Sequence, residues 1–194
     1  MAGEVVHKFR RIESKIEGVV IIEGPRFGDE RGDFAETFHK EAFAELGIDV
    51  EFVQDNHVRT ARSGTVRGLH WQSAPHAQAK LVRVMRGRII DVAVDLRPGS
   101  PTLGQHQRVE LRAQNNRQIF VPAGFAHGYA TLEADTEVSY KVSAYYAPDA
   151  EGGIRFDDGE LGIDWGVPHE SAQVSAKDRA LPSYAEVRAQ LRAG

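Results

Sequence analysis

Short apolar segments, separated by turn residues, constrain the fold of this chain more than any other feature. In the second and third quarters of the sequence such segments recur roughly every ten residues, a spacing typical of all-β sandwiches and barrels. They are residues 82–84, 91–96, 107–111, 118–121 and 137–143. In the segment 91–96, Val92, Val94 and Leu96 alternate with two aspartates and an alanine. This period of two predicts a half-buried β-strand.

Helical patterns are scarce and short. Residues 39–46 predict a small helix that ends at Gly47, a residue suited to a left-handed cap. Near the C-terminus, Ser183 and Glu186 have the spacing of a capping box and predict a helix over about 183–193. We find no repeat, low-complexity tract or linker, so residues 1–194 are expected to form a single domain. The fold class predicted is mainly β, with short peripheral helices.

Composition excludes several functional classes. The chain has no cysteine, which rules out disulfide scaffolds, thiolate nucleophiles and cysteine-ligated metal centres. It has 24 lysines and arginines against 28 acidic residues, a formal net charge of −4. A dedicated nucleic-acid-binding protein usually has an excess of positive charge, so no nucleic-acid partner is expected.

No targeting or membrane segment is visible. The N-terminal residues lead into a charged stretch that contains Lys8, Arg10 and Arg11 rather than an apolar run. The aliphatic run 19–22 is far shorter than the roughly 18 residues that a membrane helix needs. We therefore expect a cytoplasmic protein without a membrane partner.

The segment 64–72 and the following Lys80 concentrate the residue types that carry chemistry. His70 has Arg67 close by, and glycines at 64 and 68 permit close approach of the backbone. This combination favours an anionic ligand. A histidine in a β domain is also often structural, and spacing alone leaves that alternative open.

The segment 122–127 has the pattern PxGxxH and resembles the second motif of cupins, small β-barrels that often hold a metal or a ligand. Metal-binding cupins place two histidines one residue apart, followed by a glutamate, in their first motif. Here the corresponding residues are His70, Trp71 and Gln72, and no glutamate follows within ten positions. Since a tight metal site normally needs at least three protein ligands, we expect none.

Several segments in a fixed order carry a more specific resemblance. They are DERGDFAE (29–36), QDN (54–56), RGLHWQ (67–72), KLV (80–82), DVAVDLR (91–97), PAGFAH (122–127), YK (140–141) and SAKD (175–178). The ordered set, within residues 18–188, resembles the dTDP-4-dehydrorhamnose 3,5-epimerase family. The resemblance implies a cupin-like jelly-roll barrel that forms a homodimer and needs no metal or organic cofactor.

The resemblance also implies a reaction and its catalytic residues. The expected substrate is dTDP-4-dehydro-6-deoxy-D-glucose, whose C3 and C5 are both α to the C4 ketone and can be inverted by proton removal and return. His70 matches the general base, Asp178 the carboxylate that orients it, and Tyr140 the acid on the opposite face. Lys80 would stabilise the oxyanion at C4. Taken singly, these residues also fit a structural histidine, a surface carboxylate, a core aromatic and an exposed strand lysine.

Further residues match the substrate-binding positions of the family. Arg31 and Arg67 would bind the diphosphate, and His127 the sugar or the diphosphate. Tyr146 would stack near the thymine, and Phe27 is a weaker candidate for the same pocket. The remaining polar positions are Glu36, Gln54, Asn56 and Glu151. Part of the site would come from the second subunit, with Arg31 acting across the dimer. Surface ion pairs are the alternative for both arginines.

Two other functions stay open at this point. A related enzyme could invert only one carbon, or act as a 3,4-ketoisomerase, on a similar nucleotide sugar. A non-catalytic cupin could bind a sugar without transforming it. The presence of a base, an acid and an oxyanion partner together favours the double epimerase.

Overall fold

The computed structural model describes residues 9–193, which form two antiparallel β-sheets and a separate hairpin. The larger sheet has the strand order β1-β2-β10-β7-β12-β5. Its strands are β1 (Arg10–Ile12), β2 (Val20–Glu23), β10 (Arg117–Val121), β7 (Lys80–Arg86), β12 (Thr136–Val142) and β5 (Gln54–Thr60). The expected strands at 82–84, 118–121 and 137–143 are thus neighbours in one sheet.

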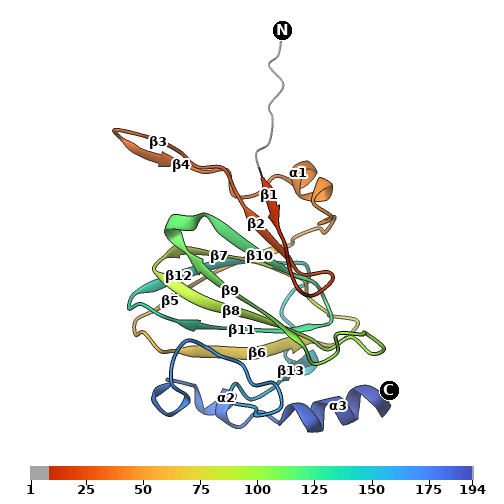
Figure 1. The fold of residues 1–194 in the computed structure, drawn as a ribbon. Coiled ribbons are helices and arrows are strands. Elements are labelled where there is room, and N and C mark those ends of the chain that lie inside the picture. Colours follow the sequence, from red (N-terminus) through yellow and green to blue (C-terminus); the bar gives the residue numbers. More distant parts are fainter. Residues whose placement is uncertain (1–8, 194) are drawn as a thin grey trace.

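The second sheet has the order β13-β6-β11-β8-β9. Its strands are β13 (Glu151–Gly153), β6 (Val66–Gln72), β11 (Phe125–Thr131), β8 (Arg88–Asp95) and β9 (His106–Arg112). The two sheets face each other, and the hairpin of β3 (Phe27–Asp29) and β4 (Gly32–Phe34) stands away from them (Figure 1). This is the mainly β, cupin-like jelly-roll architecture predicted from the sequence, which is confirmed.

The helices are short and lie outside the barrel. They are α1 (Lys40–Glu45), α2 (Ala176–Arg179) and α3 (Tyr184–Ala193), with 3-10 turns at Ala113–Asn115, Pro148–Ala150 and His169–Ser171. The ring of His39 caps α1 by accepting from the Ala42 amide, and Gly47 follows with a φ of +88°. At the start of α3, the Ser183 amide and hydroxyl donate to Glu186 Oε2 at 2.8 and 2.6 Å.

Strand β8 is buried on both faces, so the expectation of a half-buried strand was wrong. One face of β8 lies in the barrel interior, where Ile89 and Ala93 pack in one core cluster with Val82 and Ile119 of the opposite sheet. The other face packs Val92 and Val94 in a different cluster, together with residues of the C-terminal segment. The alternation of polar and apolar residues therefore separates two buried environments rather than core and solvent.

Strands β6 and β11 approach each other unusually closely. A Cβ atom added to Gly68 would lie 2.6 Å from both the Cα atom of Gly128 and the carbonyl oxygen of His127. Gly68 also has a φ of +114°, which side chains rarely adopt. Glycine at this position thus allows the two backbones to lie this close. In the register of the two strands, His70 pairs with His127.

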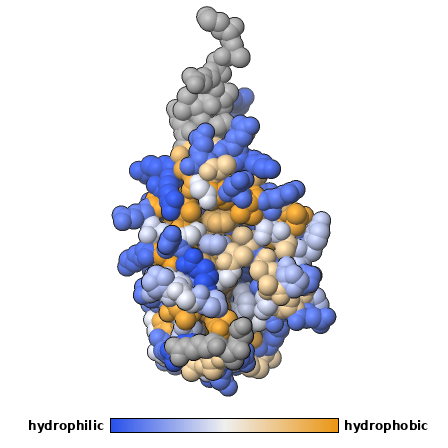
Figure 2. Space-filling model, turned by 90° about the vertical axis from the view of Figure 1, so that its right-hand side faces the viewer, coloured by the Kyte–Doolittle hydropathy of each residue, from blue (hydrophilic) through white to orange (hydrophobic). Residues whose placement is uncertain are grey.

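The side of the molecule that carries α1 shows hydrophilic side chains around smaller apolar areas (Figure 2). Within residues 9–193, no helix is long and apolar enough to cross a membrane.

Candidate active site

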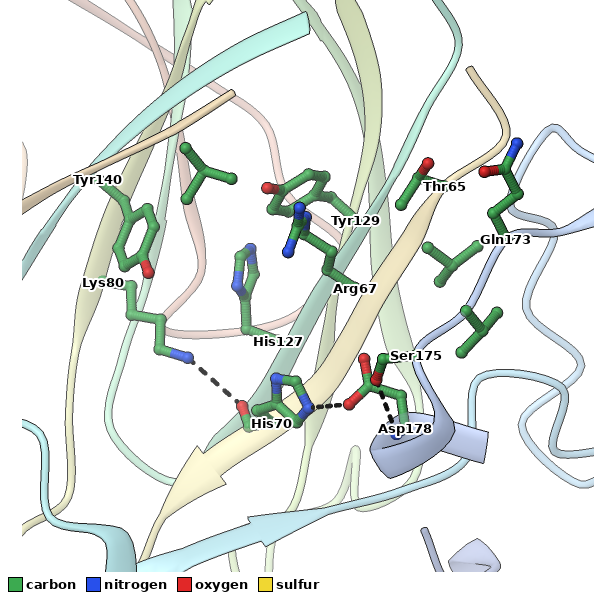
Figure 3. Close-up of a pocket in the computed structure, with 13 residues that line it drawn as sticks. Thr65, Arg67, His70, Lys80, His127, Tyr129, Tyr140, Gln173, Ser175 and Asp178 are labelled. Atoms are coloured by element: carbon green, nitrogen blue, oxygen red, sulfur yellow. Dashed lines mark hydrogen bonds and ion pairs between the residues drawn. The ribbon is translucent and has the colours of Figure 1, made fainter. Parts of the chain in front are cut away.

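A two-lobed cavity opens between the facing sheets. The main lobe has a volume of about 540 Å³, and its wall includes Arg67 and His127. The smaller lobe measures about 360 Å³ and is lined by residues such as Gln54 and Tyr146. His70, Lys80 and Tyr140 line both lobes, so they stand where the lobes meet. Figure 3 shows the main lobe.

His70 is bound to a buried carboxylate. It lies on β6, and its Nε2 is 2.8 Å from Oδ1 of Asp178 on α2. The aspartate is held in turn by the Gly68 amide at 3.4 Å, and its own amide donates to Ser175 Oγ at 3.0 Å. The side chain of Asp178 is only 7% exposed, whereas that of His70 is 30% exposed. Asp178 therefore fixes the orientation of the imidazole, and part of the ring stays accessible from the cavity.

The carboxyl group of Asp178 is kept ionised by its partner. Burial alone would raise its pKa, but the hydrogen bond and the charge of His70 outweigh burial and hold the pKa below its ordinary value. The carboxylate fixes the orientation of the imidazole and faces the ring nitrogen at 2.8 Å. The pair can therefore accept a proton from a bound molecule and hold the resulting positive charge.

Lys80 begins β7 and extends its amino group toward His70 (Figure 3). Nζ lies 3.4 Å from the backbone oxygen of His70, which is a long hydrogen bond with an uncharged acceptor. Burial lowers the pKa of Lys80 to about 8, against the opposing effects of Asp91 and Glu151. A cation in such surroundings interacts strongly with a developing negative charge.

Tyr140 faces His70 from the other sheet. It lies on β12, and its phenol points into the cavity on the side away from Asp178 (Figure 3). Burial raises the pKa of Tyr140 above its ordinary value, so the hydroxyl is protonated at neutral pH. A base and a proton donor thus stand on opposite sides of one cavity.

A second histidine–carboxylate pair lies deeper in the barrel. His127 Nε2 is 3.0 and 2.9 Å from the two carboxylate oxygens of Asp91 on β8, and Asp91 has no exposed surface. Beside it, Tyr129 is 5% exposed, and burial raises the pKa of its phenol to about 12. Neither Asp91 nor Tyr129 was among the expected site residues. In the sequence, Asp91 stands in the motif DVAVDLR and in the expected strand 91–96, whereas Tyr129 only follows the segment PAGFAH by two positions.

Arg67 also lines the main lobe. Its Nε donates to the hydroxyl of Thr60 at 3.3 Å, while the side chain as a whole is exposed. The guanidinium therefore has donors left for an anionic ligand.

Polar side chains line the smaller lobe. Gln54 Nε2 donates to Asn56 Oδ1 at 2.8 Å, on β5. Opposite them, Glu151 Oε2 accepts from Tyr146 Oη at 2.9 Å and from Lys177 Nζ at 2.7 Å. Lys177 was not among the expected site residues, although it precedes Asp178. It can be placed here only through its contact with Glu151.

Arg31 and Glu36 are not among the residues that line the cavity. Arg31 lies in the turn of the β3–β4 hairpin, where it is bound to Asp29 at 2.6 Å and its side chain is 85% exposed. The hairpin stands clear of the barrel to which it belongs (Figure 1). A single chain therefore brings together the expected site residues except these two and the weaker candidate Phe27, which lies on β3 of the same hairpin.

No group of three or more His, Asp or Glu side chains that could hold a metal ion occurs in the part of the chain that the structure describes.

Comparisons with known proteins agree along nearly the whole chain. Residues 13–186 match the family model described as dTDP-4-dehydrorhamnose 3,5-epimerase. The chain is 49% identical to the dTDP-4-dehydrorhamnose 3,5-epimerase of Sinorhizobium fredii, over 89% of this chain and 88% of that protein. The protein of the same name from Salmonella typhimurium is 46% identical, over 88% of this chain and 93% of its own length.

A solved structure extends the likeness to the fold. The dTDP-6-deoxy-D-glucose-3,5-epimerase of Legionella pneumophila, in complex with dTDP-4-keto-L-rhamnose, matches with a TM-score of 0.89 at 43% identity. The match covers 94% of this chain and 96% of that one.

Proposed function

Because the chain belongs to the dTDP-4-dehydrorhamnose 3,5-epimerase family, we propose that it is an isomerase that inverts C3 and C5 of dTDP-4-dehydro-6-deoxy-D-glucose. The product is dTDP-4-dehydro-L-rhamnose. The observation that carries this conclusion is the placement of His70 and Tyr140 on opposite sides of one cavity, with Lys80 between the two lobes.

Each inversion needs a base, an acid and a partner for the oxyanion. His70 removes the proton from the carbon next to the C4 ketone, and Asp178 stabilises the imidazolium that forms. The electron pair of the broken C–H bond moves into an enolate whose negative oxygen faces the ammonium group of Lys80. Tyr140 then delivers a proton to the opposite face of the same carbon, and both groups regain their starting state by exchange with solvent.

The smaller lobe accommodates the nucleotide. We assign Gln54, Asn56 and Glu151 to polar contacts with it, and Tyr146, which is exposed and hydrogen-bonded to Glu151, to stacking on the thymine. Arg67 is assigned to the diphosphate, and His127 to the sugar or the diphosphate. The diphosphate then lies near the junction of the lobes, and the sugar extends past it into the main lobe beside His70, Lys80 and Tyr140.

A second copy of the chain would complete the site. The β3–β4 hairpin carries Arg31 and two exposed aromatic residues, Phe27 and Phe34, which are 52% and 68% exposed. Exposed aromatic rings beside a cation suit a surface that another molecule covers. We propose a homodimer in which the hairpin brings Arg31, and the following segment Glu36, to the neighbouring cavity. The cytoplasmic location stays a prediction of the sequence.

The dimer proposal predicts complementation between two impaired variants. Arg31→Ala and His70→Asn are each expected to be impaired, but a heterodimer contains one cavity with an intact His70 and an intact Arg31. After the two variants are mixed, unfolded and refolded together, turnover is expected to exceed the sum of the separate refolded variants. Turnover equal to that sum contradicts a shared site.

The pH dependence follows from Lys80. The ammonium form binds the oxyanion, and it is the form present below the pKa of about 8. We therefore expect kcat/KM to fall above about pH 8, by about tenfold per pH unit. A profile from pH 6 to pH 10, with stability checked at each pH, tests this. A kcat/KM that stays level to pH 10 contradicts the role of Lys80.

Product analysis tests the function itself. The protein is incubated with dTDP-4-dehydro-6-deoxy-D-glucose, and the sugar is followed by proton NMR. Inversion at C3 is read from the coupling of H3 to H2, and inversion at C5, whose ring neighbour C4 carries no proton, from a nuclear Overhauser contact between H5 and H1. Inversion at both carbons is the expected result. Inversion at one carbon supports the single-centre alternative, and an unchanged sugar in the presence of folded protein contradicts both enzymes.

A further inference from the structure

The carboxylate of Asp91 is the most deeply buried charge beside the cavity. It has no exposed surface, and it lies on the face of β8 that points into the barrel. A buried carboxylate is costly unless cationic or hydrogen-bonding groups surround it. The position therefore raises the question of which groups balance its charge.

The other carboxylates near the cavity already have partners. Asp178 is bound to His70, and Glu151 is bound to Lys177 and Tyr146. Asp91 is contacted by His127 through both carboxylate oxygens, and its negative charge is also felt by Lys80. His127 and Lys80 thus share one buried negative charge.

Lys80 depends on that charge because little else nearby favours its ammonium form. Its amino group donates a hydrogen bond to the neutral backbone oxygen of His70 at 3.4 Å. The titratable groups around it come from several strands and one helix: His70 of β6, Asp91 of β8, His127 of β11, Tyr140 of β12 and Glu151 of β13, with Asp178 of α2 behind His70. Of the two carboxylates that oppose the effect of burial on Lys80, Asp91 has the larger effect.

The contact with Asp91 also determines which atom of His127 a ligand can meet. Because Nε2 lies within 3.0 Å of both oxygens, it must carry a proton that it donates to the carboxylate. Nδ1 is then the ring nitrogen left for a bound sugar. A neutral His127 would accept a hydrogen bond there, and a charged one would donate.

We propose that Asp91 is a positioning residue for the reaction: it holds the ring of His127 through both carboxylate oxygens, and its buried negative charge balances the ammonium group of Lys80, which lines the same lobe as His127. The inference rests on the proposed function, since Lys80 matters as the partner of the oxyanion. Asp91 touches neither substrate nor reacting atoms in this scheme. It acts through two side chains that do.

The variant Asp91→Asn tests this proposal, because asparagine keeps the shape and can still accept a hydrogen bond from His127. We expect the alkaline limb of the kcat/KM profile to move to lower pH by about one unit. A limb at the wild-type position, with only thermal stability reduced, would overturn the proposal.

Asp95 provides the matched control. It lies on the same strand and is equally buried, but its carboxylate is bound by Arg97, Ser100 and Thr102 at 2.7, 2.6 and 2.6 Å. Asp95→Asn is therefore expected to lower Tm without moving the alkaline limb. A shift of the limb in this variant as large as that in Asp91→Asn contradicts a specific role for Asp91.

The double variant Asp91→Asn with Lys80→Met tests the coupling of the two charges by stability, also where Asp91→Asn alone does not fold. It removes both charges, so its loss in Tm is expected to be smaller than the sum of the two single losses. If Asp91→Asn alone does not fold, recovery of folded protein in the double variant supports the proposal, and failure to recover it overturns it. Additive losses also overturn it. Since this readout needs no turnover, an inactive wild-type protein would contradict the proposed function and leave the coupling of Asp91 and Lys80 measurable.

Discussion

Replacing His70 by asparagine is expected to lower kcat by about 10²–10⁴-fold, the usual contribution of a positioned general base. Asparagine can still accept or donate a hydrogen bond toward Asp178 but cannot take up a proton at neutral pH. KM should change little, because we assign the nucleotide contacts to Gln54, Asn56, Glu151 and Tyr146 rather than to the imidazole. Steady-state kinetics on the 4-keto sugar nucleotide measures both values.

His57 supplies the control for this substitution. It lies on β5 with its side chain 60% exposed and paired with Glu137, and it does not line the cavity, although its neighbours Asn56 and Val58 do. His57→Asn is expected to keep wild-type kcat. A His70→Asn protein that is folded and turns over within a few-fold of wild type would remove His70 from the role of base.

Replacing Lys80 by methionine is the second large change. Methionine preserves the length and the apolar stem of the side chain but removes the charge that faces the oxyanion. By comparison with the loss of an oxyanion-hole donor, kcat should fall by about 10²–10³-fold. The fall in kcat/KM above about pH 8 should disappear as well, because the titrating group is gone.

Lys141 is the matched lysine. It lies on β12, the strand that pairs with β7 in the same sheet, and its Nζ is bound to Asp55 at 2.9 Å. Lys141→Met is expected to keep both kcat and the alkaline limb. If Lys80→Met instead kept the limb near pH 8, another group would be responsible for it.

Much of the fold could be predicted because local patterns decided it. The turn residues and the period of two located five strands, the first of them only in part, and His39 and Gly47 delimited α1. The burial of β8 could not be predicted in this way. Alternation predicts two different faces, and only the packing of the C-terminal segment against the outer face shows that both are covered.

For the candidate site as well, some residues could be predicted from local patterns and others could not. The order of motifs selected residues that the fold brings into one cavity, such as His70 and Asp178, which are 108 positions apart. Asp91 looked like an outward polar residue, because a charged residue in an alternating strand usually faces solvent. Arg31 shows the opposite limit: its motif marked it as a site residue, but a single chain leaves it outside the cavity. Contacts that depend on strand register or on a second subunit cannot be predicted from local sequence patterns.

Deuterium incorporation from D₂O, followed by NMR at C3 and C5 of the sugar, tests whether His70 and Tyr140 transfer the protons. If His70 and Tyr140 exchange protons with solvent between removal and return, the wild-type protein should place deuterium at both carbons. The His70→Asn variant, folded and able to bind dTDP, should place it at neither on the same time scale. Product inverted at C3 and C5 without deuterium, or undiminished exchange in His70→Asn, would contradict proton transfer through this pair.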